Sequence, residues 1–512
     1  MNRASANTLT QGDPEIFANR ERDWRNGAIV YQVLVDRFAP SSQLDAKRTL
    51  YPSPKVLRDW SEMPMAGSKL ADAKLYSHEL DFWGGDFASL RSRLDYVQQL
   101  GADVLYLNPI HLGYTNHKYD ALDFLKLSPE FGDREDFLGL VADVHNRGMK
   151  LVLDGVFNHM GRNAPIFQDA FQNPASPWRD WFAIGPQYDG GARSWMGFQN
   201  LPELNLENPA VRAYLYEDPA SVVRTYLRDG IDGWRLDTAY ELGPDYLRDL
   251  TDAAHLEKSD SLIVGEIVNY PDAWLRSMDA VMNITLFFIM FGLASGEIGS
   301  AAAGRMINRL ILDAGIEPML KSWILLDNHD IPRIATTVPN ASLRQLVQVL
   351  QFTLPGAPNL YYGSELGMTG GLDPENRAPM RWDLVQDDNP DLVWTNKLIS
   401  LRKQHRALRI GNFRLVEAER FLAFERYTDR VLETVIVIAN PSSTTITERV
   451  LIANAALMAY TPMFDALAPK DNRPVSMMEA GSLTVTLDPE TVMVLVPGEQ
   501  SLGGYSRYKR VR

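Results

Sequence analysis

Residues 232–239 read DGWRLDTA, an apolar run of β-strand length that carries the acidic residue Asp237 near its end. The runs LIVGE and SWILLDNHD end in the same way, at Glu266 and Asp330. Burying a carboxylate costs several kcal/mol unless the carboxylate is paired, so three acidic residues at the ends of apolar strands need a common explanation. A shared hydrolytic active site is the simplest one.

Apolar runs of strand length alternate with amphipathic helical stretches along most of the chain. Two helical stretches, FASLRSRLDYVQQLG and REDFLGLVADVHNRG, stop at a glycine suited to a left-handed helix C-cap. Eight strand-then-helix pairs predict a closed parallel (β/α)8 barrel, or TIM barrel, whose active-site face is formed by the carboxyl ends of the strands. The three acidic residues lie at that end of the fourth, fifth and seventh runs and are therefore expected to meet. The eight runs are AIVYQVLV (28–35), DVLYLNPI (103–110), KLVLDGVF (150–157), DGWRLDTA (232–239), SLIVGEIV (261–268), AVMNITLFF (280–288), KSWILLDN (321–328) and APNLYYG (357–363).

Two stretches depart from this period. Residues 159–208 are rich in proline, glycine and asparagine and replace a helix, which predicts a small inserted domain beside the site. After residue 410 short strands such as FLAFERY and TVIVIAN follow one another, which predicts a C-terminal antiparallel β-sandwich domain. We expect a barrel domain at 1–158 and 209–410, an inserted domain at 159–208 and a C-terminal domain at 411–512.

Composition excludes several classes of function. The net charge of −14 argues against nucleic acids and anionic membranes as partners, because both select basic surfaces. The chain has no cysteine, which excludes disulfides, thiolate nucleophiles and zinc-thiolate sites. The N-terminal segment MNRASANTLTQGDPEIF lacks the apolar core of a signal peptide, so we expect a cytoplasmic protein. Composition leaves the oligomeric state open.

The acidic residues suit the hydrolysis of a glycosidic bond. This reaction needs one carboxylate at the anomeric carbon and one carboxylic acid to protonate the leaving oxygen, roles that Asp237 and Glu266 can fill. Arg235 lies two residues before Asp237, on the same face of the strand, where its charge is expected to keep Asp237 ionised. Glu266 follows Ile263, Val264 and Gly265, an apolar setting expected to raise its pKa.

Structural roles remain open for these residues when each is taken alone. A single aspartate at a strand end is as often a satisfied ion pair or helix cap. Asn328, His329 and Asp330 could equally form a metal site or a satisfied loop. His329 and His159 can donate hydrogen bonds to sugar hydroxyl groups, although an isolated histidine is more often structural.

The order of motifs resembles the α-amylase family of retaining glycoside hydrolases over about residues 28 to 410. The motifs are GADVLYLNPI, LVLDGVFNH, LPELN, GIDGWRLDTAYE, IVGEI, LLDNHD and LPGAPNLYYGSELGM. The resemblance implies that Asp237 is the nucleophile, Glu266 the general acid/base and Asp330 the transition-state stabiliser. It also implies that four residues surround the cleaved sugar: Arg235, His159, His329 and Tyr119. Among them, Tyr119 is the aromatic platform under the sugar.

Within the family the sequence is most similar to the neopullulanase, cyclomaltodextrinase and maltogenic amylase group. The similarity lies in NHKYD (116–120), a glutamate four residues after the nucleophile, DAVMN (279–283) and GGLDPENRAPM (370–380). It implies further substrate-binding residues: His117, Glu241, Asp373 and Arg377. Asp373 and Arg377 are expected to contact the next sugar outward, and an exposed ion pair is the alternative for them. The first run begins near residue 28, so the extra N-terminal domain of this group is not expected.

This resemblance implies an α-1,4-glucan substrate, with maltooligosaccharides, cyclodextrin, pullulan and starch as candidates. A transglycosylase, an exo-acting α-glucosidase and a non-catalytic sugar-binding protein are the alternatives. The chemistry requires no cofactor. Calcium is possible, because Asn158 matches a family ligand and Asp36 and Asp86 lie in segments that bind it in relatives, but FAPSSQLD lacks the usual ligand spacing.

Overall fold

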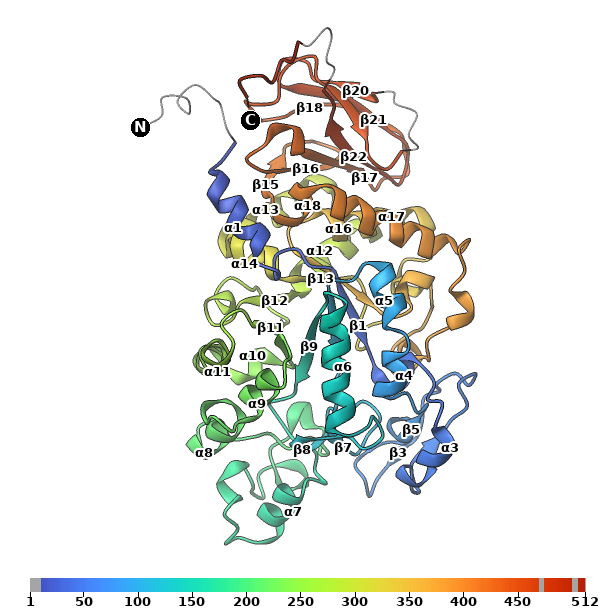
Figure 1. Ribbon diagram of the computed structural model, residues 1–512, viewed down its shortest axis with the longest axis vertical. Coiled ribbons are helices and arrows are strands. Elements are labelled where there is room, and N and C mark those ends of the chain that lie inside the picture. The colour runs from blue at the N-terminus through green and yellow to red at the C-terminus, as the bar shows by residue number, and fades with distance from the viewer. Residues whose placement is uncertain (1–10, 469–473, 500–504, 512) are drawn as a thin grey trace.

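The computed structural model describes residues 11–468, 474–499 and 505–511, and its centre is a closed barrel of eight parallel strands (Figure 1). The strands follow one another around the barrel in the order β1-β14-β13-β12-β11-β10-β9-β6, which confirms the predicted (β/α)8 fold. Each strand lies within one of the eight predicted runs. They are β1 (Val30–Val33), β6 (Val104–Leu107), β9 (Lys150–Gly155), β10 (Gly233–Leu236), β11 (Leu262–Ile267), β12 (Ala280–Asn283), β13 (Trp323–Leu325) and β14 (Ala357–Tyr361).

Helices surround the barrel, and Figure 1 shows α6 running alongside β9. The left-handed C-cap predicted at a glycine is present after α5, where Gly101 has φ 97°. No helix among the described residues is long and apolar enough to cross a membrane. The longer helices are α1 (Pro14–Arg22), α5 (Leu94–Leu100), α6 (Arg134–Asn146), α9 (Val222–Arg228), α11 (Pro244–Glu257), α12 (Ile284–Ser295), α13 (Ser300–Ala314), α16 (Ala341–Thr353) and α17 (Pro390–Gln404). Shorter helices are α4 (Phe87–Arg91), α8 (Pro209–Arg212), α10 (Ala239–Leu242), α14 (Ile316–Lys321), α15 (Ile334–Thr337) and α18 (Arg406–Ile410).

Two details of the predicted strand-then-helix pattern are wrong. The run 280–288 is a strand only as far as Asn283, whose side chain accepts a hydrogen bond from the Leu286 amide at 3.0 Å and starts helix α12. The stretch between β11 and β12 contains only the single turn η7 (Trp274–Arg276) in place of an α-helix.

Long segments leave the barrel at the carboxyl ends of β1, β6 and β9. The segment after β9 contains α7 (Pro165–Gln172), and bridges such as His159 to Glu203 join its two ends to each other. The segment after β1 was not predicted, because its strands are two residues long and carry no periodicity. It contains α2 (Val35–Phe38), α3 (Leu44–Lys47), β2 (Val56–Leu57), β3 (Lys69–Leu70), β4 (Leu75–Tyr76), η2 (Ser77–Leu80) and β5 (Asp81–Phe82). The hairpin after β6 consists of β7 (His111–Gly113) and β8 (Ala121–Leu127).

The C-terminal part is antiparallel β-structure with a hydrophobic core of its own, as predicted. It lies at the opposite end of the molecule from α7 in Figure 1. The predicted domain boundaries stay predictions, and those at residues 1 and 512 lie outside the described residues. The strands are β15 (Asn412–Val416), β16 (Leu422–Tyr427), β17 (Val435–Asn440), β22 (Thr491–Pro497), β19 (Pro462–Asp465) and β20 (Ser476–Met477) in one sheet, and β18 (Ile446–Leu451) and β21 (Ser482–Leu487) in a separate pair.

Candidate active site

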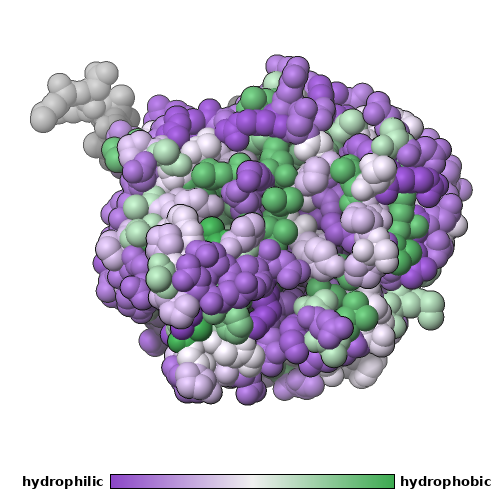
Figure 2. All heavy atoms as spheres, turned by 90° about the horizontal axis from the view of Figure 1, so that it is seen from below, coloured by the Kyte–Doolittle hydropathy of each residue, from purple (hydrophilic) through white to green (hydrophobic). Residues whose placement is uncertain are grey.

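A cavity of about 710 Å³ lies at the carboxyl ends of the barrel strands. Its walls come from the barrel, from the segment after β1 and from the segment after β9. Seen from below, the end of the molecule that carries these segments is largely hydrophilic, with hydrophobic residues interspersed (Figure 2). Asp237, Glu266 and Asp330 all line the cavity, so the barrel brings together three carboxylates that lie far apart in the sequence.

Arg235 lies beneath the cavity and connects two of these carboxylates. Its Nη1 donates to Asp237 Oδ1 at 2.9 Å, and its Nη2 lies 2.9 Å from Glu266 Oε2. Nη1 also donates at 2.9 Å to Asp154, which faces Arg235 across the β9–β10 ladder and was missed by the sequence analysis. Burial raises the pKa of Asp237, and the Arg235 charge offsets part of this rise. The predicted contact between Arg235 and Asp237 exists, but the Arg235 charge lowers the pKa of Asp237 by less than burial raises it.

The apolar setting predicted for Glu266 is wrong. Besides the contact with Arg235, its carboxylate accepts a hydrogen bond from the Thr238 backbone amide at 2.9 Å. Thr238 has φ 39°, a left-handed conformation that is strained for a β-branched residue and is found mainly at functional sites. This strained turn directly after Asp237 aims its amide at Glu266. Nothing in the sequence signals it.

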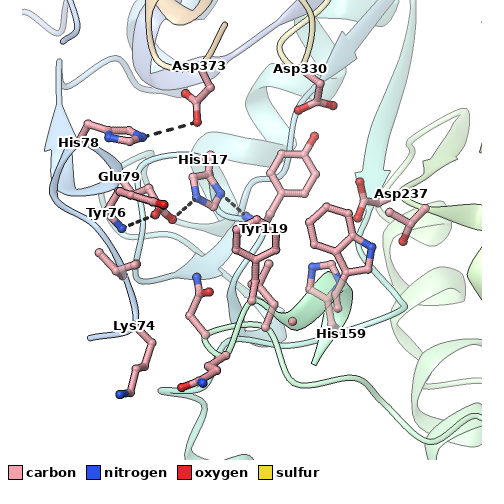
Figure 3. Close-up of a pocket in the computed structure, with 18 of the residues that line it drawn as sticks. Lys74, Tyr76, His78, Glu79, His117, Tyr119, His159, Asp237, Asp330 and Asp373 are labelled. Carbon is pink, nitrogen blue, oxygen red and sulfur yellow. Dashed lines mark hydrogen bonds and ion pairs between the residues drawn. The ribbon is translucent and has the colours of Figure 1, made fainter. Parts of the chain in front are cut away.

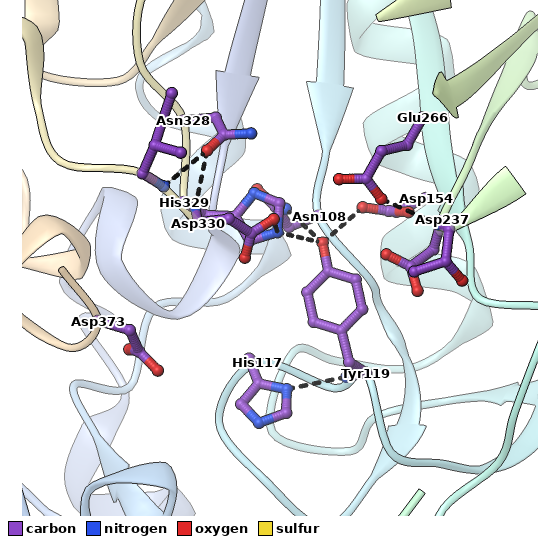
Figure 4. Close-up of polar contacts among 12 residues, drawn as sticks. Asn108, His117, Tyr119, Asp154, Asp237, Glu266, Asn328, His329, Asp330 and Asp373 are labelled. Carbon is purple, nitrogen blue, oxygen red and sulfur yellow. Dashed lines mark hydrogen bonds and ion pairs between the residues drawn. The ribbon is translucent and has the colours of Figure 1, made fainter. Parts of the chain in front are cut away.

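Tyr119 lines the cavity and stacks on His329, which is buried and does not itself line the cavity (Figure 4). Their rings are parallel to within 5°, with centroids 5.2 Å apart. The His329 Nδ1 faces the amide groups of Asn108 and Gln32 at 3.2 and 3.0 Å, so it accepts and Nε2 carries the proton. Nε2 lies 2.6 Å from Tyr119 Oη, which in turn donates to Asp154 at 2.8 Å. Burial lowers the pKa of His329 well below its usual value, which keeps the ring neutral.

Asp330 lies at the other side of the cavity, in contact with the predicted pair Asp373 and Arg377. The Arg377 Nη2 is 3.3 Å from Asp330, and its Nη1 is 3.4 Å from Asp373. Burial raises the pKa of Asp373. The charges of Arg377 and His78 lower it by a larger amount, so the net pKa is below the usual value. Arg377 is buried and donates to the His329 carbonyl at 2.9 Å, whereas Asp373 is exposed, so the alternative of an exposed pair holds for the aspartate only.

His117 and His159 both line the cavity, as predicted for residues that bind sugar hydroxyl groups. The His117 Nδ1 accepts the Tyr119 backbone N–H at 3.1 Å, and its Nε2 faces Glu79 at 3.1 Å. Burial lowers the pKa of His159 to about 3. The His159 Nε2 is buried and has no hydrogen-bond partner among the described residues. Sequence analysis missed Glu79, and it missed Trp195, whose ring stacks on His159 at 5.7 Å.

Other predicted residues lie outside the cavity. Glu241 does not line it and instead accepts a hydrogen bond from the Asn158 side chain at 3.1 Å. The Asp36 carboxylate accepts the backbone amides of Trp83 and Gly84.

Asp86, the third candidate calcium ligand, is also engaged within the protein. It caps helix α4 through the Ser89 amide and contacts the Lys47 ammonium group. Within the described ranges, no group of three or more acidic or histidine side chains is arranged to hold a metal ion. Asp86, one of the three candidates, does not fit a calcium site, because an ammonium group already neutralises its buried carboxylate.

A closed (β/α)8 barrel with paired carboxylates in an aromatic-lined cavity defines a glycoside hydrolase. The chain belongs to the α-amylase family: residues 32–393 match the family description "Alpha amylase, catalytic domain". The family indicated by the motifs is confirmed.

Individual relatives agree with this family. The cyclomaltodextrinase of Geobacillus thermopakistaniensis (strain MAS1) is 34% identical over 446 residues, which cover 82% of this chain and 70% of the relative. Neopullulanase 2 of Thermoactinomyces vulgaris is 33% identical over 419 residues, covering 79% of this chain and 67% of the relative. Among solved structures, the cyclic alpha-maltosyl-(1→6)-maltose hydrolase of Arthrobacter globiformis, in complex with cyclic alpha-maltosyl-(1→6)-maltose, has a TM-score of 0.77 at 29% identity. The match covers 92% of this chain and 99% of that chain. The predicted similarity to the cyclomaltodextrinase and neopullulanase group is confirmed.

Proposed function

We propose that the protein is a retaining hydrolase of α-1,4-glucosidic bonds in maltooligosaccharides and related α-glucans, both linear and cyclic. The main support is Arg235, whose guanidinium lies 2.9 Å from Asp237 and 2.9 Å from Glu266. One guanidinium can contact both only if the two carboxylates are near neighbours. A retaining enzyme needs its nucleophile and its acid/base about 5–5.5 Å apart.

In the first step, a carboxylate oxygen of Asp237 bonds to the anomeric carbon while the glycosidic C–O bond breaks. Glu266 gives its proton to the leaving oxygen. In the second step, Glu266 takes a proton from water, the water oxygen bonds to the anomeric carbon, and the ester to Asp237 breaks. A sugar hydroxyl group in place of water gives transfer to a second sugar. Asp330 and Arg377 line the cavity and are suited to hold hydroxyl groups of the reacting ring, while neutral His329 supports Tyr119 from behind.

The rings of Tyr119, Trp195 and Phe198 line the cavity and offer apolar faces on which sugars stack. Relatives named cyclomaltodextrinase and neopullulanase favour cyclodextrin and pullulan as substrates beside maltooligosaccharides. A cytoplasmic location stays a prediction.

Product analysis tests this function directly. We expect maltotriose, β-cyclodextrin and pullulan to be cleaved, and proton NMR during the first turnovers to show products with the α configuration. Longer oligomers formed from maltotriose indicate transfer, and glucose as the sole product indicates an exo-acting enzyme. An initial β product contradicts retention. Oligosaccharide binding without release of reducing sugar contradicts hydrolysis and supports the sugar-binding alternative.

We also propose that the fold needs no added calcium, because Lys47 supplies the positive charge beside Asp86. Burial raises the pKa of Asp86, and the hydrogen bond from Lys47 helps to lower it below the usual value. The melting temperature is expected to change by less than about 1 °C between chelator and millimolar calcium, since a ligand stabilises only the state that it binds. Lys47→Met is expected to destabilise the fold by about 1–3 kcal/mol, because the buried carboxylate loses its charged partner.

Differential scanning calorimetry measures both effects. Lys126→Met is the matched control, since Lys126 pairs with Asp123 at the surface and its side chain is 70% exposed. Its loss is expected to change stability by less than about 0.5 kcal/mol. A rise of several degrees in the melting temperature of the wild type on addition of calcium contradicts this proposal.

A further inference from the structure

The segment after β1 forms a wall of the cavity that the proposed chemistry does not use. Gly67, Lys74, Tyr76 and His78 line the cavity from the β3–β4 hairpin and the turn that follows it. In Figure 3, Tyr76 and His78 lie on the opposite side of the cavity from Asp237, and His78 lies next to Asp373. This wall is therefore at the end of the cavity that is remote from the nucleophile.

Tyr76 and His78 present a combination of groups that suits a sugar ring. Their rings are stacked, with centroids 5.6 Å apart and planes inclined by 21°, and Tyr76 is 41% exposed. The His78 Nδ1 accepts the Gly67 backbone N–H at 3.0 Å, so in the neutral ring Nε2 carries the proton. Nε2 lies 3.7 Å from Asp373 Oδ2, which is longer than a hydrogen bond and leaves a donor and an acceptor that a hydroxyl group can bridge.

The wall is fixed to the turn that carries Tyr119. The Asn116 side chain donates to the carbonyls of His78 and Asp81 at 2.9 and 2.8 Å. Glu79 accepts the Tyr76 backbone N–H at 2.6 Å and faces His117 at 3.1 Å. These contacts hold the ring pair in place before a ligand binds, which lowers the entropic cost of binding.

The positions of Asp237 and Glu266 indicate on which side of the cleaved bond the wall lies. Glu266 protonates the leaving oxygen, so the departing sugars extend on the side of Glu266 and its neighbour in the lining, Val268. The sugars that stay on the enzyme extend the other way, past Asp330 and Asp373. Counted from the cleaved bond, the resemblance to the α-amylase family implies that the first retained ring lies over Tyr119 and the second beside Asp373.

We propose that the stacked pair of Tyr76 and His78 is the binding platform for the third retained glucose ring. The Tyr76 ring is 41% exposed and lines the cavity, and its partner His78 lies next to Asp373, beside which the second ring is expected. The platform selects substrates with at least three glucose units on the retained side. It rests on the proposed function, because that function defines which side is retained.

Tyr76→Ala tests the platform through substrate length. The ratio of kcat/KM for maltohexaose to kcat/KM for maltotriose is expected to fall about fivefold, the size of a lost aromatic stacking contact. Tyr76→Phe keeps the ring and is expected to restore the ratio. Asp72→Ala is the matched control, because Asp72 is exposed in the turn of the same hairpin and does not line the cavity. Its ratio is expected to equal that of the wild type.

An unchanged ratio in Tyr76→Ala overturns the proposal. A raised ratio also overturns it, because the pair would then be a barrier to long substrates. Isothermal titration of maltohexaose and maltotriose into Asp237→Asn, with and without Tyr76→Ala, measures the same preference without turnover. Absence of hydrolysis in the wild type refutes the proposed function without deciding the platform. The platform is decided by the titration, in which Tyr76→Ala should weaken binding of maltohexaose more than binding of maltotriose.

Discussion

Asp237→Asn is expected to lower kcat on maltoheptaose on the order of 10⁴-fold or more, which corresponds to about 5.5 kcal/mol of barrier. The amide cannot form the ester with the anomeric carbon, and it carries no charge to stabilise the positive charge that develops there. The fold is expected to survive, because the amide oxygen can still accept the 2.9 Å hydrogen bond from Arg235. Reducing-sugar assays and thermal melting measure the two effects.

Asp260→Asn is the control for this substitution, since Asp260 is exposed and does not line the cavity. It is expected to retain the wild-type rate. A correctly folded Asp237→Asn protein with wild-type turnover would refute the assignment of the nucleophile. A loss of both activity and folding would point to a structural role for the carboxylate, which Asp237→Glu would then separate from catalysis, because glutamate keeps the charge but displaces it.

The barrel could be predicted from sequence because its strands are short, apolar and spaced by helices. Asp237, Glu266 and Asp330 stood out because each ends such a run, and a parallel barrel brings these ends together. The wall at residues 66–79 could not be predicted in this way. Its strands β3 and β4 have two residues each, and its lining residues mix polar and apolar side chains, so no periodicity marks it.

The surroundings of a strand residue come mainly from neighbouring strands, and this limits what sequence can say about the site. Val264 and Ile263 precede Glu266, yet Val264 packs inside the barrel and Ile263 packs in the outer core. Glu266 instead meets Arg235 and Thr238, which belong to β10 and the turn after it. Arg235 and Asp237 were paired correctly because residues two apart on a strand share a face. Asp154 was missed because its contact with Arg235 depends on the register between strands.

Glu266→Ala is expected to affect substrates according to their leaving groups. On maltotriose kcat/KM should fall about 10²–10⁴-fold, because the leaving sugar oxygen no longer receives a proton. On 2,4-dinitrophenyl α-maltoside the fall in the first step should be much smaller, because dinitrophenolate leaves without protonation. The intermediate on Asp237 then accumulates, since water also lacks its base. A burst of dinitrophenolate in stopped-flow absorbance measures this accumulation.

Azide distinguishes this mechanism from a single displacement. Azide needs no general base, so it should restore turnover of the activated substrate by Glu266→Ala and yield the α-maltosyl azide, in which two inversions have retained the configuration. Glu297→Ala, at an exposed position outside the cavity, should hydrolyse maltotriose normally and gain nothing from azide. A β-azide from Glu266→Ala would mean that azide attacked the substrate directly. Asp237 would then have no covalent role, even though its contact with Arg235 holds it close to Glu266.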